Sequence, residues 1–396
     1  MILQENKHKK LFIIILAAAI LFKLSIFVFG VMRVPDSILD SDSEAYLVTA
    51  KTIYTQGVFG YQNDNGGVRF DAFKTPGYPV FLAITHNAMK IPLNGVILIQ
   101  LLLTVFAGIV TYRIATEIDY KLGFLSMAIA LFDPPTSVFS LKIMTEALYV
   151  LLLFLFIYVF IRYLKSGRAG SIILSALLLA AATYVRPISY FLGMGAAIFM
   201  VYANIARNYK KTLIQAAVFL VVVYSFLGIW QIRNYQRVGT SSFAAVGDSN
   251  FKIHGLASKV EKSDNYLLQG INYAGCAGQS FVNLMTLPGS LKYYKSKPFA
   301  ILGKAIFYPW MVFWLIGFLV GCVKIKRNIY YQFLIWVMLY FIAVTIINIS
   351  NAGGERFRIP MVASIAVIAA YGWSAISDFW GRRKCCGREE KVKCSQ

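Results

Sequence analysis

Charged residues are scarce in this sequence, and acidic residues are scarcer than basic ones. Only 14% of the 396 residues are charged, with 18 aspartates and glutamates against 39 lysines and arginines. A soluble domain carries about 25% charged residues, whereas 58% of the residues here are hydrophobic. Because long apolar runs recur from end to end, the composition excludes a soluble enzyme with a single anchor and predicts a polytopic membrane protein.

Cysteine and histidine are also few, with five and three residues. Cys385, Cys386 and Cys394 lie in a basic tail that we expect in the reducing cytosol, and their spacing lacks the paired ligands of a zinc site. The sequence therefore predicts neither a disulfide framework nor a metal site. Of the histidines, we expect His254, in a long loop near Lys252, to contact a polar substrate.

The net charge of +21 could indicate a nucleic-acid partner, but the basic residues fall in short clusters between apolar runs. Cytoplasmic loops of membrane proteins have this pattern, and no basic-aromatic module accompanies the charge. We therefore expect a membrane and no nucleic acid.

The apolar runs predict an all-α fold, a bundle of about ten transmembrane helices. Every short basic loop falls on one side when both termini are cytoplasmic. Lys23 lies within the first span, where it either snorkels or faces the bundle. The predicted spans cover about residues 11–32, 96–112, 123–132, 144–161, 172–185, 188–205, 213–230, 305–323, 329–347 and 359–376.

Two outer loops accompany these spans in a transmembrane domain of residues 1–380. Residues 33–92 form a first outer loop that contains short helices at the membrane interface, and residues 231–304 form a second, longer one. Residues 381–396 form a basic cytoplasmic tail.

The remaining polar side chains gather on the predicted outer side, from six separate places in the chain. Snorkelling explains any single arginine at a helix end, but it has to be invoked five times on the side where short loops usually avoid arginine. The set therefore suggests a site. Its members are Asp40, Asp42, Glu44, Arg69, Lys74, Lys142, Glu146, Arg186, Arg233, Asn234, Glu355, Arg356 and Arg358.

The acidic segment around Asp42 has several interpretations. Asp42 and Glu44 do not share a helix face, so at most one points into a given site, whereas Asp42 and Tyr46 can be neighbours at i and i+4. Ser41 or Ser43 could instead make the segment a helix N-cap. The Asp-Ser-Asp triplet that begins at Asp40 would also suit a divalent ion, although spacing alone is weak support.

Glu146 follows Thr145 at the start of the predicted fourth span. A carboxylate in the first turn of a helix is favourable with the helix dipole. This purely structural explanation of Glu146 is about as strong as a functional one.

Several short motifs occur in an order that spans most of the chain. With them, the chain resembles the GT-C superfamily of multi-pass glycosyltransferases, which take a sugar from a polyprenyl-phosphate carrier. The branch that it resembles most contains the protein O-mannosyltransferases and the lipid A aminoarabinose transferase. The motifs are Asp42–Ala50, Gly57–Gly60, Thr75–Ala83, Thr145–Leu148, Val185–Pro187, Trp230–Tyr235 with Gly239, and Arg356–Pro360.

The resemblance implies roles for three residues. The catalytic acid of the family falls on Asp42, its basic residue before Pro-Gly-Tyr-Pro falls on Lys74, and its second acidic position falls on Glu146. Asp40 and Glu44 are then supporting carboxylates. No cofactor is required, although an acidic cluster allows a divalent cation.

The expected reaction is a transfer with inversion, in which Asp42 takes the proton of the acceptor. Cations must stabilise the phosphate that leaves. The candidates are Lys74, Arg233, Arg356 and Arg358, with Arg69 as a weaker one. We expect the substrate pocket to include Tyr46, Tyr78, Arg186, Asn234 and His254.

The expected partners are a polyprenyl-phosphate-linked sugar and a lipid, glycan or protein acceptor, with the chemistry on the extracytoplasmic face of a bacterial plasma membrane. A transporter or flippase of lipid-linked sugars would share the basic outer residues, but it should place polar groups near the midplane and show related halves. A polymerase or ligase would use the arginines of the long outer loop without needing Asp42. A membrane scaffold would leave the carboxylates unexplained.

Overall fold

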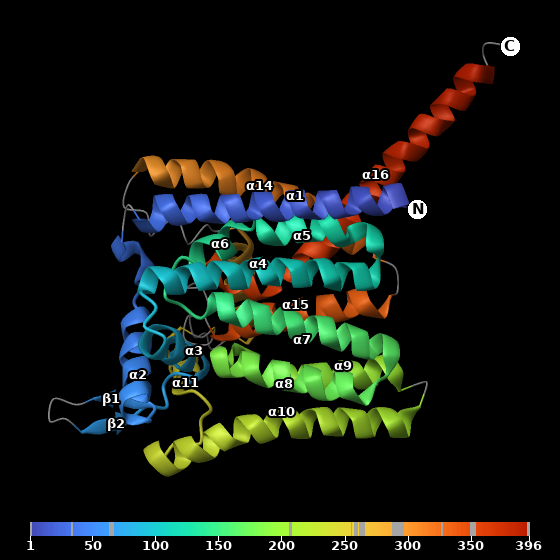
Figure 1. Cartoon of the computed structure of the whole chain (residues 1–396). Coiled ribbons are helices and arrows are strands. Elements are labelled where there is room, and N and C mark those ends of the chain that lie inside the picture. Colours follow the sequence, from blue (N-terminus) through green and yellow to red (C-terminus); the bar gives the residue numbers. More distant parts are fainter. Residues whose placement is uncertain are drawn as a thin grey trace.

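The computed structural model describes residues 2–32, 35–62, 67–205, 208–254, 256, 260, 266–286, 297–325, 328–348 and 354–393. Long helices run side by side in one bundle (Figure 1). The helices are α1 (Ile2–Phe27), α2 (Ser43–Gln56), α3 (Gly77–Leu82), α4 (Leu93–Ile118), α5 (Gly123–Leu131), α6 (Pro134–Phe139), α7 (Glu146–Ser166), α8 (Ala169–Val185), α9 (Leu192–Asn204), α10 (Tyr209–Val238), α11 (Ala245–His254), α13 (Tyr266–Thr286), α14 (Lys297–Lys324), α15 (Ile329–Asn348) and α16 (Val362–Lys393), with π-helical turns η1 (Val28–Met32) and η3 (Ala83–Ala88) and the 3₁₀ helix η7 (Glu355–Met361).

Within these described ranges, eight helices are long and apolar enough to cross a membrane. Two shorter apolar helices, Tyr120–Leu131 and Ala169–Val185, lie where the sequence predicts the third and fifth spans. The polytopic helical fold is thereby confirmed, because each of the ten predicted spans coincides with a helix.

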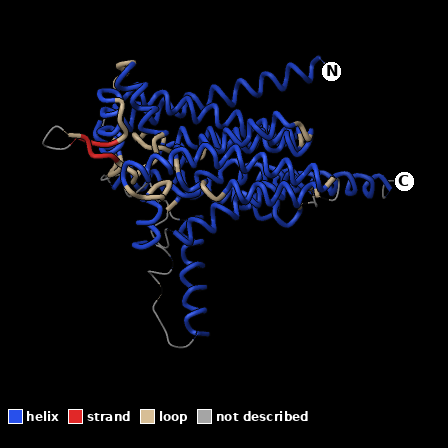
Figure 2. Tube along the Cα trace, turned by 90° about the horizontal axis from the view of Figure 1, so that it is seen from below, coloured by secondary structure: helices blue, strands red, loops and turns tan. Residues whose placement is uncertain are grey.

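Both termini lie at one end of the bundle, and α2, α3 and α11 lie at the other end, here called the pocket end (Figure 1). A small hairpin of β1 (Gly60–Gln62) and β2 (Val68–Phe70) also lies at the pocket end (Figure 2). Its strands pair antiparallel. Three-residue strands are too short to show an alternating pattern, so the sequence periodicity did not predict them.

The first outer loop contains the expected short helices. The helix α2 ends at Gln56 and is followed by Gly57, whose φ of 66° is a left-handed conformation that glycine adopts without strain. The helix α3 continues into η3, so that residues 77–88 form one helical stretch. In the long outer loop, α10 continues past Trp230 to Val238, and α11 and α13 follow.

The bundle interior explains two features of the sequence. Lys23 is buried and donates a hydrogen bond to the Ser137 hydroxyl at 3.1 Å, so it faces the bundle and does not snorkel. The helices α14 and α16 approach closely through small residues. A Cβ atom on Gly372 would lie 1.8 Å from the carbonyl oxygen of Gly317 and 2.6 Å from the amide nitrogen of Gly321.

Candidate active site

A cavity of about 470 Å³ opens at the pocket end. Its walls come from α2, the chain before α3, the junction of α8 and α9, α10 and α11 with the chain between them, the end of α15, and η7. The lining includes Asp42, Tyr46, Lys74, Arg186, Tyr190, Phe191, Gln231, Ser242, Phe243, Val246, Val344, Asn348, Arg356 and Phe357.

Asp42 supplies the carboxylate of this lining. It occupies the N-cap position of α2, where the sequence offered Ser41 or Ser43 as the cap, and its own side chain makes no capping hydrogen bond. Instead, Lys74 donates to its Oδ1 at 3.1 Å and to its backbone carbonyl at 3.3 Å. Nη2 of Arg356 lies 4.0 Å from Oδ2. The side chain is 42% exposed, so a substrate hydroxyl can reach it.

Lys74 is held against both Asp42 and an aromatic ring. Its Nζ lies 4.1 Å from the centroid of the Tyr46 ring, a cation–π arrangement. Burial, followed by the negative charge of Asp42, raises the pKa of the Tyr46 phenol, so this phenol stays protonated.

The turn after Lys74 packs tightly on α8, because a Cβ on Gly77 would lie 2.7 Å from the carbonyl oxygen of Tyr184. Glycine is therefore needed where the sequence has Pro-Gly-Tyr-Pro.

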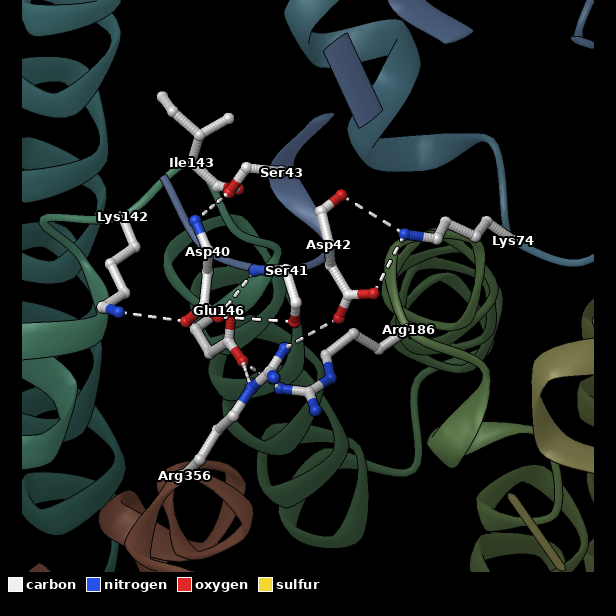
Figure 3. Close-up of polar contacts among 10 residues, drawn as sticks. All are labelled: Asp40, Ser41, Asp42, Ser43, Lys74, Lys142, Ile143, Glu146, Arg186 and Arg356. Carbon is white, nitrogen blue, oxygen red and sulfur yellow. Dashed lines mark hydrogen bonds and ion pairs between the residues drawn. The ribbon is translucent and has the colours of Figure 1, made fainter. Parts of the chain in front are cut away.

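Glu146 is the first residue of α7, as predicted, and it is buried. Its Oε1 accepts a hydrogen bond from Nη1 of Arg186 at 2.9 Å and another from Nε of Arg356 (Figure 3). Glu146 thus holds two arginines that line the cavity. A carboxylate engaged in this way anchors cations and is not a candidate base.

Asp40 lies two residues before Asp42 in sequence, but its carboxylate pairs with a different residue (Figure 3). Its Oδ2 accepts a hydrogen bond from Nζ of Lys142 at 3.0 Å, and its Oδ1 accepts one from the Ser41 amide at 2.8 Å. Burial alone would raise the pKa of this carboxyl, but the hydrogen bonds and the charge of Lys142 outweigh burial and hold the pKa below its usual value.

The charges around the cavity do not balance. Lys74, Arg186 and Arg356 carry three positive charges against two negative charges on Asp42 and Glu146. The surplus is positive and faces a cavity, so the site favours an anion. The described ranges contain no group of three or more histidines, cysteines, aspartates or glutamates that could hold a metal ion.

Two arginines that were predicted to bind phosphate lie elsewhere. Arg233 donates hydrogen bonds to the carbonyls of Phe59 and Asp71, and so fastens α10 to the hairpin region. Arg358 is buried and donates to the carbonyl of Met285 at 2.6 Å. Neither belongs to the cavity lining.

Other predicted residues also lie outside the lining. Asn234 donates to the carbonyl of Ser242 at 3.0 Å, and Tyr78 is buried and donates to Gln100.

Arg69 is exposed on β2, over the ring of Tyr61. Glu44 is exposed on α2. His254 ends α11, but its side chain lies outside the described part of the structure.

The sequence missed Tyr190, Gln231, Phe243 and Asn348, which line the cavity. Gln231 belongs to the quoted Trp-Gln-Ile-Arg-Asn-Tyr motif, in which the sequence pointed to Arg233 and not to Gln231. The other three have no sequence feature that distinguishes them from core or interface residues.

Comparison with known proteins bears on the motifs between residues 74 and 230. A model of the dolichyl-phosphate-mannose-protein mannosyltransferase family matches residues 74–230. No curated protein sequence matches the chain.

Two crystal structures of the oligosaccharyltransferase of Archaeoglobus fulgidus share the fold. The complex with zinc and sulfate has a TM-score of 0.57 at 14% identity, over 93% of this chain and 50% of that one. The apo form has a TM-score of 0.56 at 13% identity, over 94% and 52%. The chain therefore spans about half the length of that enzyme. The family match and the shared fold confirm the resemblance to the GT-C glycosyltransferases.

Proposed function

We propose that this protein is a membrane glycosyltransferase that moves a sugar from a polyprenyl-phosphate carrier to an acceptor, with inversion at the anomeric carbon. One observation carries the proposal. The exposed carboxylate of Asp42 lies in a cavity with a positive surplus, between Lys74 at 3.1 Å and Arg356 at 4.0 Å. A base beside a phosphate-binding site is what such a transfer needs.

Asp42 is the base in this proposal. The oxygen or nitrogen of the acceptor attacks the anomeric carbon from the face opposite the phosphate, and its proton passes to the Asp42 carboxylate. A base in this role contributes about 10²–10⁴-fold to the rate. The bond from the anomeric carbon to the phosphate oxygen breaks, and its electron pair leaves with the phosphate through an oxocarbenium-like transition state.

Arg186, Arg356 and Lys74 stabilise the phosphate as its negative charge grows. Arginine suits this role because its planar guanidinium donates two parallel hydrogen bonds to phosphate. Glu146 orients both guanidinium groups before the substrate binds, so little reorganisation is needed during the reaction. Arg233 and Arg358, which donate to backbone carbonyls outside the cavity, have no part in the proposal.

The extracytoplasmic face of a bacterial plasma membrane is the proposed location of the pocket end. At the opposite end, where both termini lie, the short connections carry Lys121 and Arg168, and Lys210 and Lys211 lie in the first turn of α10, as the positive-inside rule expects near the cytoplasm. The polyprenyl chain then lies among the helices while its phosphate enters the cavity.

The acceptor class is a lipid, a glycan or a protein, and no cofactor takes part. The pairing of Asp40 with Lys142 and of Asp42 with Lys74 supports a reaction without a divalent cation, since each carboxylate already has a cationic partner.

Mass spectrometry of glycolipids and glycoproteins from cells with and without the gene tests the proposal. The expected result is one missing glycan together with an accumulated polyprenyl-phosphate sugar, which identifies acceptor and donor at once. Complementation with Asp42→Asn should leave the glycan missing, although the protein is present in the membrane. Restoration of the glycan by Asp42→Asn at wild-type level would falsify the assignment of the base.

A further inference from the structure

Two segments that are far apart in sequence lie side by side behind the cavity. One precedes α2 and ends at Asp42, and the other precedes α7 and leads into Glu146, the first residue of that helix. The Ile143 amide donates to the Ile38 carbonyl at 2.8 Å, and the Ser43 hydroxyl donates to the Ile143 carbonyl at 2.9 Å. These bonds join the segment of one site carboxylate to the segment of the other.

An ion pair completes this junction. Nζ of Lys142 lies 3.0 Å from Oδ2 of Asp40, and the two side chains are only 7% and 8% exposed. Neither residue belongs to the lining of the cavity, so the pair does not meet a substrate there. The side chain of Gln100, on α4, accepts a hydrogen bond from the Tyr78 hydroxyl and donates one to the Lys142 carbonyl at 2.6 Å. The second bond ties the backbone of Lys142 to α4.

The location of the pair is more informative than its strength. A buried ion pair contributes little net stability, because desolvation offsets the attraction, and an apolar pair of similar volume often does as well. Such a pair can instead specify one arrangement of the chain. Here Asp40 lies two residues before Asp42, and Lys142 lies four residues before Glu146. The guanidinium of Arg356 contacts both of these carboxylates, so their spacing determines where that guanidinium lies.

We propose that Asp40 and Lys142 are positioning residues, whose ion pair sets the spacing between Asp42 and Glu146 and thereby the place of Arg356 in the cavity. The kinetic part of this inference rests on the proposed glycosyl transfer, whereas the structural part does not. A displacement of about 1 Å in a catalytic group can cost about 10²-fold in rate.

The test compares three purified full-length variants. Asp40→Asn/Lys142→Met removes both charges of the pair together, so neither member is left as a buried charge without the other. Lys142→Arg keeps the charge. The matched control is Glu117→Gln/Lys165→Met, which removes the partly exposed pair at 2.9 Å between the far ends of α4 and α7.

Hydrogen–deuterium exchange of residues 38–46 and 140–146 is the first readout, and it needs no substrate. Asp40→Asn/Lys142→Met should exchange about 10-fold faster in these segments at an unchanged unfolding temperature, since each segment loses its tie to the other. Lys142→Arg and the control pair should stay within about 2-fold of wild type. Wild-type exchange in Asp40→Asn/Lys142→Met, or equally fast exchange in Lys142→Arg, would overturn the inference.

Transfer kinetics with polyprenyl-phosphate mannose as probe are the second readout. Asp40→Asn/Lys142→Met should lower kcat about 10²-fold with KM within about 3-fold, because binding groups remain while their alignment is lost. An unchanged kcat in this double variant overturns the positioning role. The failure of wild-type protein to transfer any sugar would count against the proposed function alone, because the exchange result stands without it.

Discussion

Arg356 and Glu146 lie 210 residues apart in sequence and form an ion pair at the head of α7. The other edge of the same guanidinium faces Asp42 at 4.0 Å. One arginine therefore connects the anchoring carboxylate with the proposed base. A substitution at Glu146 should consequently change the position of the Arg356 guanidinium beside Asp42.

Glu146→Gln should destabilise the protein and slow transfer, because two arginines lose the charge that orients them. Removing one partner of a buried ion pair costs about 3–5 kcal/mol. The measurements are thermal unfolding in detergent and kcat for transfer. Glu117→Gln, in the partly exposed pair with Lys165, is the control and should cost no more than about 1 kcal/mol. Equal unfolding temperatures for the two variants would contradict the anchoring role.

Arg356→Lys should lower kcat by about 10²–10³-fold, because one donor to the developing phosphate charge is lost. Arg233→Met should behave differently. It removes the hydrogen bonds to Phe59 and Asp71, so it lowers the unfolding temperature and leaves KM for the donor unchanged. A rise in donor KM in Arg233→Met would restore the sequence-based assignment of this arginine to phosphate.

The Asp40–Lys142 pair predicts a pH dependence of stability. The pKa of Asp40 is lower in the folded protein than its usual value, so its contribution is fully present above the unfolded-state pKa of about 3.9. This contribution is lost as the pH falls through the lowered value. The difference in unfolding temperature between wild type and Asp40→Asn should therefore be present at neutral pH and disappear on acidification below about pH 4. A difference that grows on acidification would have the wrong sign.

Transfer should persist after removal of divalent cations. Asp40 and Asp42 are paired with Lys142 and Lys74, so the reaction does not depend on an ion at these carboxylates. Protein treated with EDTA and dialysed should keep kcat within about 2-fold of the untreated protein. Loss of activity that added Mn²⁺ or Mg²⁺ restores would show that a cation belongs to the site.

Gly372→Ala should destabilise the bundle, since its Cβ would lie 1.8 Å from the carbonyl oxygen of Gly317. Overpacking of this kind typically costs about 1–3 kcal/mol. Gly228→Ala on α10 is the matched control, because a Cβ there meets nothing within 4 Å. Thermal unfolding of both variants measures the difference, and equal temperatures would argue against close packing of α14 on α16.

The positions of the helices were predictable from the sequence alone. A membrane span must present a long apolar run, and the backbone hydrogen bonds have to be satisfied within it. The carboxylate of Asp42 and the amine of Lys74 were also predictable, since they flank recognisable motifs of the first outer loop. The hairpin of β1 and β2 was not, because its strands are too short for a pattern.

Which arginines reach the cavity was decided by the tertiary structure. Arg186, Arg233, Arg356 and Arg358 all lie just outside a predicted span on the same side, and hydropathy reports the depth of a residue along the membrane normal. It does not report the direction in which a helix faces around the bundle, which packing against neighbouring helices determines. The sequence therefore determined that basic residues gather at one face of the membrane. Only the packed bundle turned Arg186 and Arg356 toward Asp42, and Arg233 and Arg358 away from it.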